Sequence, residues 1–121
     1  MKLYKRYVLI FLVMAIALSL SAQAAGKRKK IFSPAPGVLC DQYICADAQH
    51  GVSDKLTERY LGHAQVRHLR KMGKFNRQSF TLTNGIHCDI NDKKCYVDRY
   101  FDAQGQHSAV SQQYTQLLFG Q

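Results

Sequence analysis

The stretch "GVLCDQYICAD" at residues 37–47 decides how this chain folds, because "GIHCDINDKKCYVD" at residues 85–98 repeats its pattern. Each stretch has a glycine, a β-branched residue, one variable residue, a cysteine and an aspartate. A second cysteine and another aspartate follow after a short gap. We interpret the repeat as scaffolding, that is, as one structural solution used twice, and not as catalytic chemistry.

Each cysteine pair is placed to close a β-hairpin. Cys40 and Cys45 lie symmetrically about Gln42-Tyr43, and Cys88 and Cys95 lie symmetrically about Asn91-Asp92. A reversal of the chain at these central residues brings the two cysteines of each pair opposite one another. Opposed residues of antiparallel strands are close enough for a disulfide. The predicted bridges are Cys40–Cys45 and Cys88–Cys95, the second in a non-hydrogen-bonded pair closed by a loop at residues 90–93.

Other uses of these residues fit less well. Structural zinc sites favour shorter gaps between paired cysteines than the four and six residues found here. A redox pair would need the Cys-x-x-Cys motif, which the sequence lacks. Asp41 and Asp89 could form a carboxylate pair, but short polar residues beside turns more often cap backbone N–H groups. We therefore predict no metal and no cofactor.

Residues 1–24 have the pattern of a secretory signal peptide. Lysine and arginine precede an apolar run at residues 7–20, and Ala22 and Ala24 fit the small-residue positions of a cleavage site. The run is shorter than the ~18–20 residues that span a bilayer, which disfavours a membrane anchor. We expect export, cleavage after Ala24 and an oxidising compartment in which the four cysteines form two disulfides.

The basic character of the chain is local. The whole sequence has a formal net charge of +9. Without the three cations of the signal the charge is +6, and without "KRKK" at residues 27–30 it is +2. Residues 25–36, which hold this cluster and two prolines, are predicted to form a flexible arm. Residues 37–121 are predicted to form one small domain.

The domain is predicted to be α+β, with one or two short helices before an antiparallel β-meander. Residues 51–62 start with a serine or aspartate cap and end at a glycine, as a helix does. Residues 63–73 have a second, less regular helical pattern. The apolar positions expected on the buried faces are Leu56, Tyr60 and Leu61 in the first helix, and Val66, Leu69 and Met72 in the second.

From residue 78 the apolar period changes to two, which predicts strands. These strands cover residues 79–83, 86–90 and 95–101. Asn84-Gly85 predicts the first hairpin, since both residues tolerate a positive φ, and residues 102–105 predict a type I turn. Residues 106–121 fit either a helix, with Val110, Tyr114, Leu117 and Leu118 on one side, or a final strand.

Four segments in order resemble a known family: "SPAPGVLCDQYICAD", "LTERYLG", "FTLTNGIHCD" and "DRYFDAQG". They are similar to the Fels-1 prophage protein-like family of small exported proteins from enteric bacteria, over about residues 33–105. The resemblance implies a periplasmic protein with a four-cysteine domain and a phage-associated or accessory origin. It implies no catalytic residue, because the family has no established activity.

Little in the sequence predicts catalysis. Glu58 is the only glutamate, and its spacing gives no reason to pair it with an aspartate as a glycosidase would require. The Gly-x-Ser-x-Gly motif is absent. His63 and His68 are five residues apart, which does not align two ligands on one helical face. We interpret all five histidines as surface or half-buried residues, namely His50, His63, His68, His87 and His107, and predict that the protein is not an enzyme.

A cationic segment is the feature that points to a partner. From Arg59 to Arg77 there are six Lys or Arg residues and no acidic residue. The candidate anion-binding residues, on one stripe of the second helix, are Arg67, Arg70, Lys71 and Lys74. The stripe is either a solvated helix face or a docking surface for anionic envelope components, such as lipopolysaccharide phosphate or acidic lipid. Nucleic acid is disfavoured, because aromatic residues do not alternate with these cations.

A protein partner is the alternative. Small exported disulfide domains often present a turn or a strand edge to another protein, and the turns at residues 91–94 and 102–106 are available for this. The sequence therefore predicts a non-enzymatic binding or accessory module, with a protein-binding inhibitor or accessory factor as the second interpretation.

Overall fold

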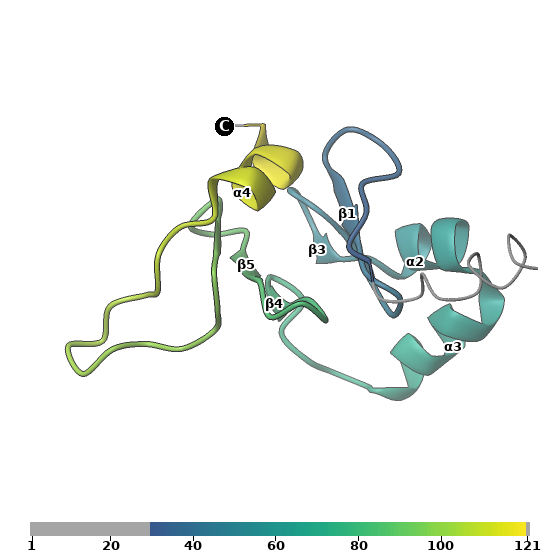
Figure 1. Ribbon diagram of the computed structural model, residues 1–121. Helices are drawn as coiled ribbons and strands as arrows, with labels where there is room; N and C mark the ends of the chain where they lie inside the picture. The colour runs from purple at the N-terminus through teal and green to yellow at the C-terminus, as the bar shows by residue number, and fades with distance from the viewer. Residues whose placement is uncertain (1–29, 121) are drawn as a thin grey trace, which may run out of the picture.

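The computed structural model describes residues 30–120. They form an α+β domain, as the sequence predicted (Figure 1). In chain order the elements are β1 (Val38–Cys40), β2 (Cys45–Asp47), β3 (Gly51–Val52), α2 (Asp54–Leu61), α3 (His63–Lys71), β4 (Ser79–Thr81), β5 (His87–Asp89), β6 (Lys94–Tyr96) and α4 (Gln112–Phe119). The predicted signal and the first part of the predicted arm lie outside these residues. None of the helices in the described range is long and apolar enough to cross a membrane.

The strands form two antiparallel sheets, ordered β1-β2-β3 and β4-β5-β6. In the first, Cys40 lies opposite Cys45, and in the second, Cys88 lies opposite Cys95. The two predicted disulfides are confirmed, with Cα–Cα distances of 4.1 and 4.0 Å. One core joins both sheets, and it includes Leu39, Val52, Leu69, Phe80, Leu82 and Leu118.

Both predicted helices are present. Ser53 caps α2 by accepting a hydrogen bond from the N–H of Leu56, and Gly62, with φ of 95°, separates α2 from α3. Val66 and Leu69 of α3 are buried, as predicted. Met72 is not: α3 ends at Lys71, and the Met72 side chain is 64% exposed. The predicted apolar positions of α2 pack around the first disulfide: Leu56, Tyr60 and Leu61.

The third predicted strand, residues 95–101, is too long. β6 ends at Tyr96, which lies opposite His87, the first residue of β5. Beyond it the chain pairs with residues 107–110 only at isolated positions, Tyr96 with Val110 and Phe101 with His107. Residues 97–110 then form a long loop that extends away from the domain (Figure 1). Of the two structures predicted for residues 106–121, a helix and a final strand, the helix is present as α4.

The two predicted turns are present, with one difference. In the first, the Gly85 N–H donates to the Leu82 C=O at 2.9 Å, and only Gly85, not Asn84, has a positive φ. This is the three-residue hairpin loop with glycine in the left-handed position, not the two-residue Asn-Gly turn. In the second, the Gly105 N–H donates to the Asp102 C=O at 3.0 Å.

The sequence pattern extends further than the cysteines. Phe32 exchanges two backbone hydrogen bonds with Cys40, of 2.9 and 2.8 Å, and Phe80 lies opposite Cys88 in the same way. Phe32 thus adds to the edge of β1, so this part of the segment predicted as an arm packs with the domain.

The helix after each hairpin is attached to the second cysteine by the same contacts. The backbone N–H of Ser53, the cap of α2, donates to the Cys45 C=O at 2.9 Å. The N–H of Ser111, the cap of α4, donates to the Cys95 C=O at 2.8 Å. The domain thus contains two copies of one unit: a strand pair with its disulfide, followed by a capped helix.

Candidate functional site

A groove of about 750 Å³ lies between α3, β4 and the loop that joins β1 to β2. Its apolar lining comes from three separate segments: Tyr43 and Ile44, then Leu69, Met72 and Phe75, then Phe80 and Leu82. Tyr43 is 52% exposed and Met72 is 64% exposed. Exposed apolar side chains that line a concave surface are typical of a binding site.

One wall of the groove is the outer edge of β4. β4 pairs with β5 on one side only. On its other side, the Arg77 C=O accepts a 2.8 Å hydrogen bond from the N–H of Val52, just before β4 begins. Beyond β4, the N–H of Thr83 donates to the Asp41 carboxylate at 3.1 Å. These two bonds join the sheet of β1–β3 to the sheet of β4–β6, one at each end of the free edge of β4.

Asp41 is a structural cap, as the sequence predicted. It is 2% exposed. Its Oδ1 accepts from the N–H groups of Tyr43 and Ile44, at 2.7 and 2.9 Å, while Oδ2 accepts from Thr83. Asp89 caps its own loop in the same way, through the N–H groups at residues 91 and 92. The two aspartates are therefore not a carboxylate pair.

His87 lies on the opposite face of β4 and β5 from the core. Its Nε2 is 2.9 Å from the Ser79 hydroxyl, and its Nδ1 is 2.9 Å from the Thr81 hydroxyl. Both ring nitrogens thus have partners, and the ring holds β4 against β5. Burial lowers the pKa of His87 below the ordinary histidine value; nearby His107 and Arg99 lower it too, against the opposing effect of Asp89. A neutral imidazole has one N–H donor and one acceptor nitrogen, so it can form one hydrogen bond of each kind with the two hydroxyls.

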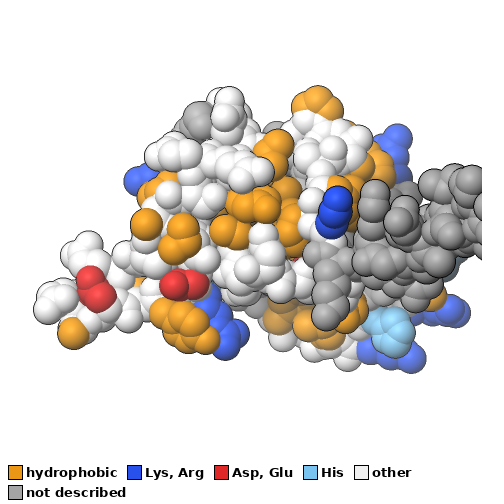
Figure 2. Space-filling model, in the orientation of Figure 1, with side chains coloured by type: hydrophobic (Ala, Val, Ile, Leu, Met, Phe, Trp, Pro, Cys, Tyr) orange, Lys and Arg blue, Asp and Glu red, His pale blue; other side chains and the backbone are white. Residues whose placement is uncertain are grey.

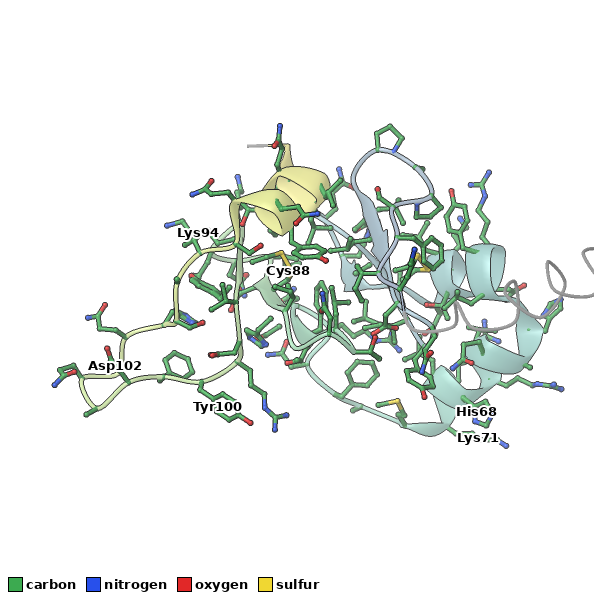
Figure 3. The ribbon with its side chains drawn as sticks, in the orientation of Figure 1. His68, Lys71, Cys88, Lys94, Tyr100 and Asp102 are labelled. Atoms are coloured by element: carbon green, nitrogen blue, oxygen red, sulfur yellow. A yellow bond between two sulfur atoms is a disulfide. The ribbon has the colours of Figure 1, made fainter. Side chains whose placement is uncertain are left out.

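The four cations of the predicted stripe have different environments in the structure. Arg70 forms ion pairs with Asp54 and Glu58, at 3.6 Å each. Lys74 lies beyond the end of α3. Arg67 and Lys71 remain exposed on α3 and, with Ala64 and His68, line a hollow of about 180 Å³. His68 also lines the groove, and Figure 3 shows His68 and Lys71 together near the end of α3.

Comparison with known proteins gives the chain its family. The family model described as "YcgJ protein" matches residues 31–119. The chain belongs to the YcgJ family. A relative from Escherichia coli (strain K12), "Uncharacterized protein YcgJ", is 41% identical over 88 residues, which are 72% of this chain and 71% of that protein. No solved structure matches.

The YcgJ family match begins at residue 31, next to Phe32 at the edge of β1. The match includes both disulfides and every residue that lines the groove. The two disulfides indicate that this YcgJ family member works outside the cytoplasm. The family description contains neither an activity nor a prophage, so the Fels-1 resemblance is retained only in its broader sense, a small enterobacterial family without known function.

A second exposed apolar surface lies on the loop at residues 97–110. Val97, Tyr100 and Phe101 are exposed, and Tyr100 and Asp102 project from the loop in Figure 3. The His107 ring anchors this loop by stacking on Tyr96, with centroids 4.0 Å apart. In the orientation of Figure 1 the loop extends to the left of the domain, where Figure 2 shows a protrusion. Among residues 30–120, no three His, Cys, Asp or Glu side chains are grouped to hold a metal ion.

Proposed function

We propose that this YcgJ family protein is a non-enzymatic binding module of the periplasm, which holds an apolar portion of a protein ligand in the groove between α3 and β4. The observation that supports this function is the groove, whose lining includes the exposed side chains of Tyr43 and Met72. This choice favours the protein-binding interpretation over the envelope surface.

The contacts of four of the eight acidic side chains support a non-enzymatic role. Glu58 and Asp54 are engaged by Arg70, and Asp54 also by Arg77 at 3.0 Å. Asp41 and Asp89 are bonded to backbone N–H groups. Carboxylates held in this manner maintain the fold and are not positioned across a cleft from one another as acid–base pairs are.

Display of random nine-residue peptides, selected on oxidised protein purified from the periplasm, tests this function. Met72→Asp should abolish binding of the selected peptides, because it places a charge in the apolar groove. Val97→Asp is the matched control, since Val97 is also exposed but lies outside the groove. Equal loss with both variants, or no selected peptide, would reject the groove as the binding site.

Binding to an anionic surface is a second candidate, favoured by the hollow that Arg67, His68 and Lys71 line. Its test is sedimentation with phosphatidylglycerol vesicles. Arg67→Glu with Lys71→Glu should reduce binding, and the reduction should be steepest at low salt, where screening is weak. A variant lacking residues 27–30 is the control for the basic arm. If only that deletion removes binding, the α3 surface is merely solvated.

Export is proposed from the signal pattern and the disulfides together. Amino-terminal sequencing of the periplasmic protein should begin at Ala25. Recovery of Met1 would contradict the cleavable signal.

We also propose the phage-associated origin that the Fels-1 resemblance implies. Phage genes beside the genes of relatives of this chain would support it.

A further inference from the structure

We infer that the groove binds an extended, acidic segment of another protein as an added β-strand on the outer edge of β4. The inference rests on the proposed function, and specifies the ligand and how it is recognised. Strand addition supplies affinity through backbone hydrogen bonds and specificity through alternate side chains.

The pairing of β4 with β5 determines which backbone groups face the groove. The Leu82 N–H donates to the Ile86 C=O, and the Ile90 N–H donates to the Gln78 C=O. Hydrogen-bonded positions alternate along an antiparallel pair, so Phe80 also bonds to β5, opposite Cys88. Ser79 and Thr81 therefore direct their backbone N–H and C=O groups to the outer edge. Across residues 30–120, no partner for these backbone groups is found.

This free edge is short and has defined ends. The same edge is occupied at Arg77 by Val52 and at Thr83 by Asp41. Between them only Ser79 and Thr81 are open, and both residues line the groove. Unpaired edges invite strand addition, and proteins normally cover or charge them. Here the edge is left open inside an apolar groove, which admits an added strand of about three residues.

The faces of β4 determine the side-chain pattern of the ligand. Phe80 points toward the core, together with Leu69 of α3 and Val52 of β3. The ligand residue opposite Phe80 would point to the same side and should be apolar. Its two neighbours would point to the side of Ser79, Thr81 and His87, and should be polar.

Charge determines what flanks these three residues. Residues 59–88 contain no aspartate or glutamate. Arg70 and Arg77 are neutralised by ion pairs. Arg67 and Lys71 are exposed on α3, and Lys74 is exposed just beyond it. Figure 2 shows Lys, Arg and His side chains beside hydrophobic ones on that part of the surface. Complementary charge steers association and selects partners, so acidic flanks are expected.

The probe is a synthetic nine-residue peptide with a central Thr-Val-Thr sequence and glutamates at both ends. The target is oxidised protein purified from the periplasm after expression of the full chain. On binding, amide hydrogen exchange at Ser79 and Thr81 should slow by at least about tenfold, since both N–H groups gain a partner. Exchange at Phe80, already bonded to β5, is the internal reference. A peptide with lysines in place of the glutamates should bind more weakly.

Thr81→Pro provides the matched genetic test. Proline removes an N–H group at the outer edge, where no described residue uses it, and edge strands tolerate this change. Binding should weaken by about tenfold or more. Thr81→Val is the control, because it keeps the N–H and removes only the hydroxyl that contacts His87. It should bind as the natural protein does.

The outcomes separate this inference from the proposed function. If the peptide binds and Met72→Asp abolishes binding, but exchange at Ser79 and Thr81 does not slow, the groove binds a protein segment without strand addition and the inference is wrong. If neither this peptide nor any displayed peptide binds the groove, both fail. The exchange measurement uses the natural sequence, so it decides the question even if Thr81→Pro does not fold.

Discussion

The backbone N–H of Cys45 donates a 3.0 Å hydrogen bond to the buried hydroxyl of Thr57 in α2. The N–H of Cys95 donates to the buried hydroxyl of Thr115 in α4 in the same manner, at 2.9 Å. Each disulfide is therefore held against its helix by a threonine as well as by the serine cap. Neither helix could rotate on its sheet without breaking this bond.

Replacement of Thr57 by valine tests that attachment. Valine keeps the shape but leaves the buried N–H of Cys45 without a partner, which should lower the free energy of unfolding by ~1–3 kcal/mol. Thr57→Ser is the control, because it keeps the acceptor oxygen and loses one methyl group, at ~1 kcal/mol. Urea unfolding of the oxidised protein measures both. A smaller effect for valine than for serine would contradict the role of the hydroxyl.

Removal of one disulfide should weaken the domain without abolishing the fold. Cys88 and Cys95 are separated by only seven positions, and a loop of this size contributes ~2 kcal/mol in the chain-entropy model. The variant with Cys88→Ala and Cys95→Ala should unfold cooperatively at a lower urea concentration. Peptide mapping of the natural protein without reductant should recover the two local bridges, and a peptide linking Cys40 to Cys88 or Cys95 would refute the arrangement.

Gly51→Ala should be among the most damaging small substitutions. Gly51 has a φ of +73°, and a Cβ there would overlap the Arg77 carbonyl that Val52 bonds. We expect a loss of ~2 kcal/mol or more, from backbone strain and displacement of this contact. Gly85→Ala is the matched control, with a φ of +93° but open space around the added methyl group. It should cost only ~1–2 kcal/mol. Equal losses by urea unfolding would show that the close approach is unimportant.

Stability should fall as the solution becomes acidic, through His87. Its pKa in the folded protein is below the ordinary value of about 6.5, mainly because of burial. The unfolded chain therefore takes up the proton first. The contribution of neutral His87 is complete above about pH 6.5 and is lost as the pH falls through the lowered pKa. The difference in unfolding free energy between the natural protein and His87→Gln should shrink on acidification. A difference that grows would contradict this sign.

The local parts of the fold could be predicted because short-range geometry determines them. Symmetric spacing around a turn was enough to pair Cys40 with Cys45 and Cys88 with Cys95. A longer form of the repeat went unnoticed, although the signal was present. Phe32 and Gly37 precede Cys40 by the same intervals at which Phe80 and Gly85 precede Cys88. Recognition of this longer repeat would have placed Phe32 in the domain instead of in the arm.

The groove could not be predicted, because it depends on long-range packing. Its lining comes from segments around Tyr43, Met72 and Phe80 that are distant in sequence. Met72 fits the helical period but follows the last turn of α3, so it is free to line the groove instead of the core. Likewise, periodicity alone identifies β4 as a strand and cannot reveal that one of its edges is unpaired.

Both cysteines of the first bridge precede both cysteines of the second along the chain. A polypeptide that passes through a membrane pore with its amino end first would present Cys40 and Cys45 to the oxidising side before the second pair emerged. Each cysteine would then meet its correct partner in the order of translocation. Such a chain can complete its covalent structure without an isomerase to rearrange mispaired bridges.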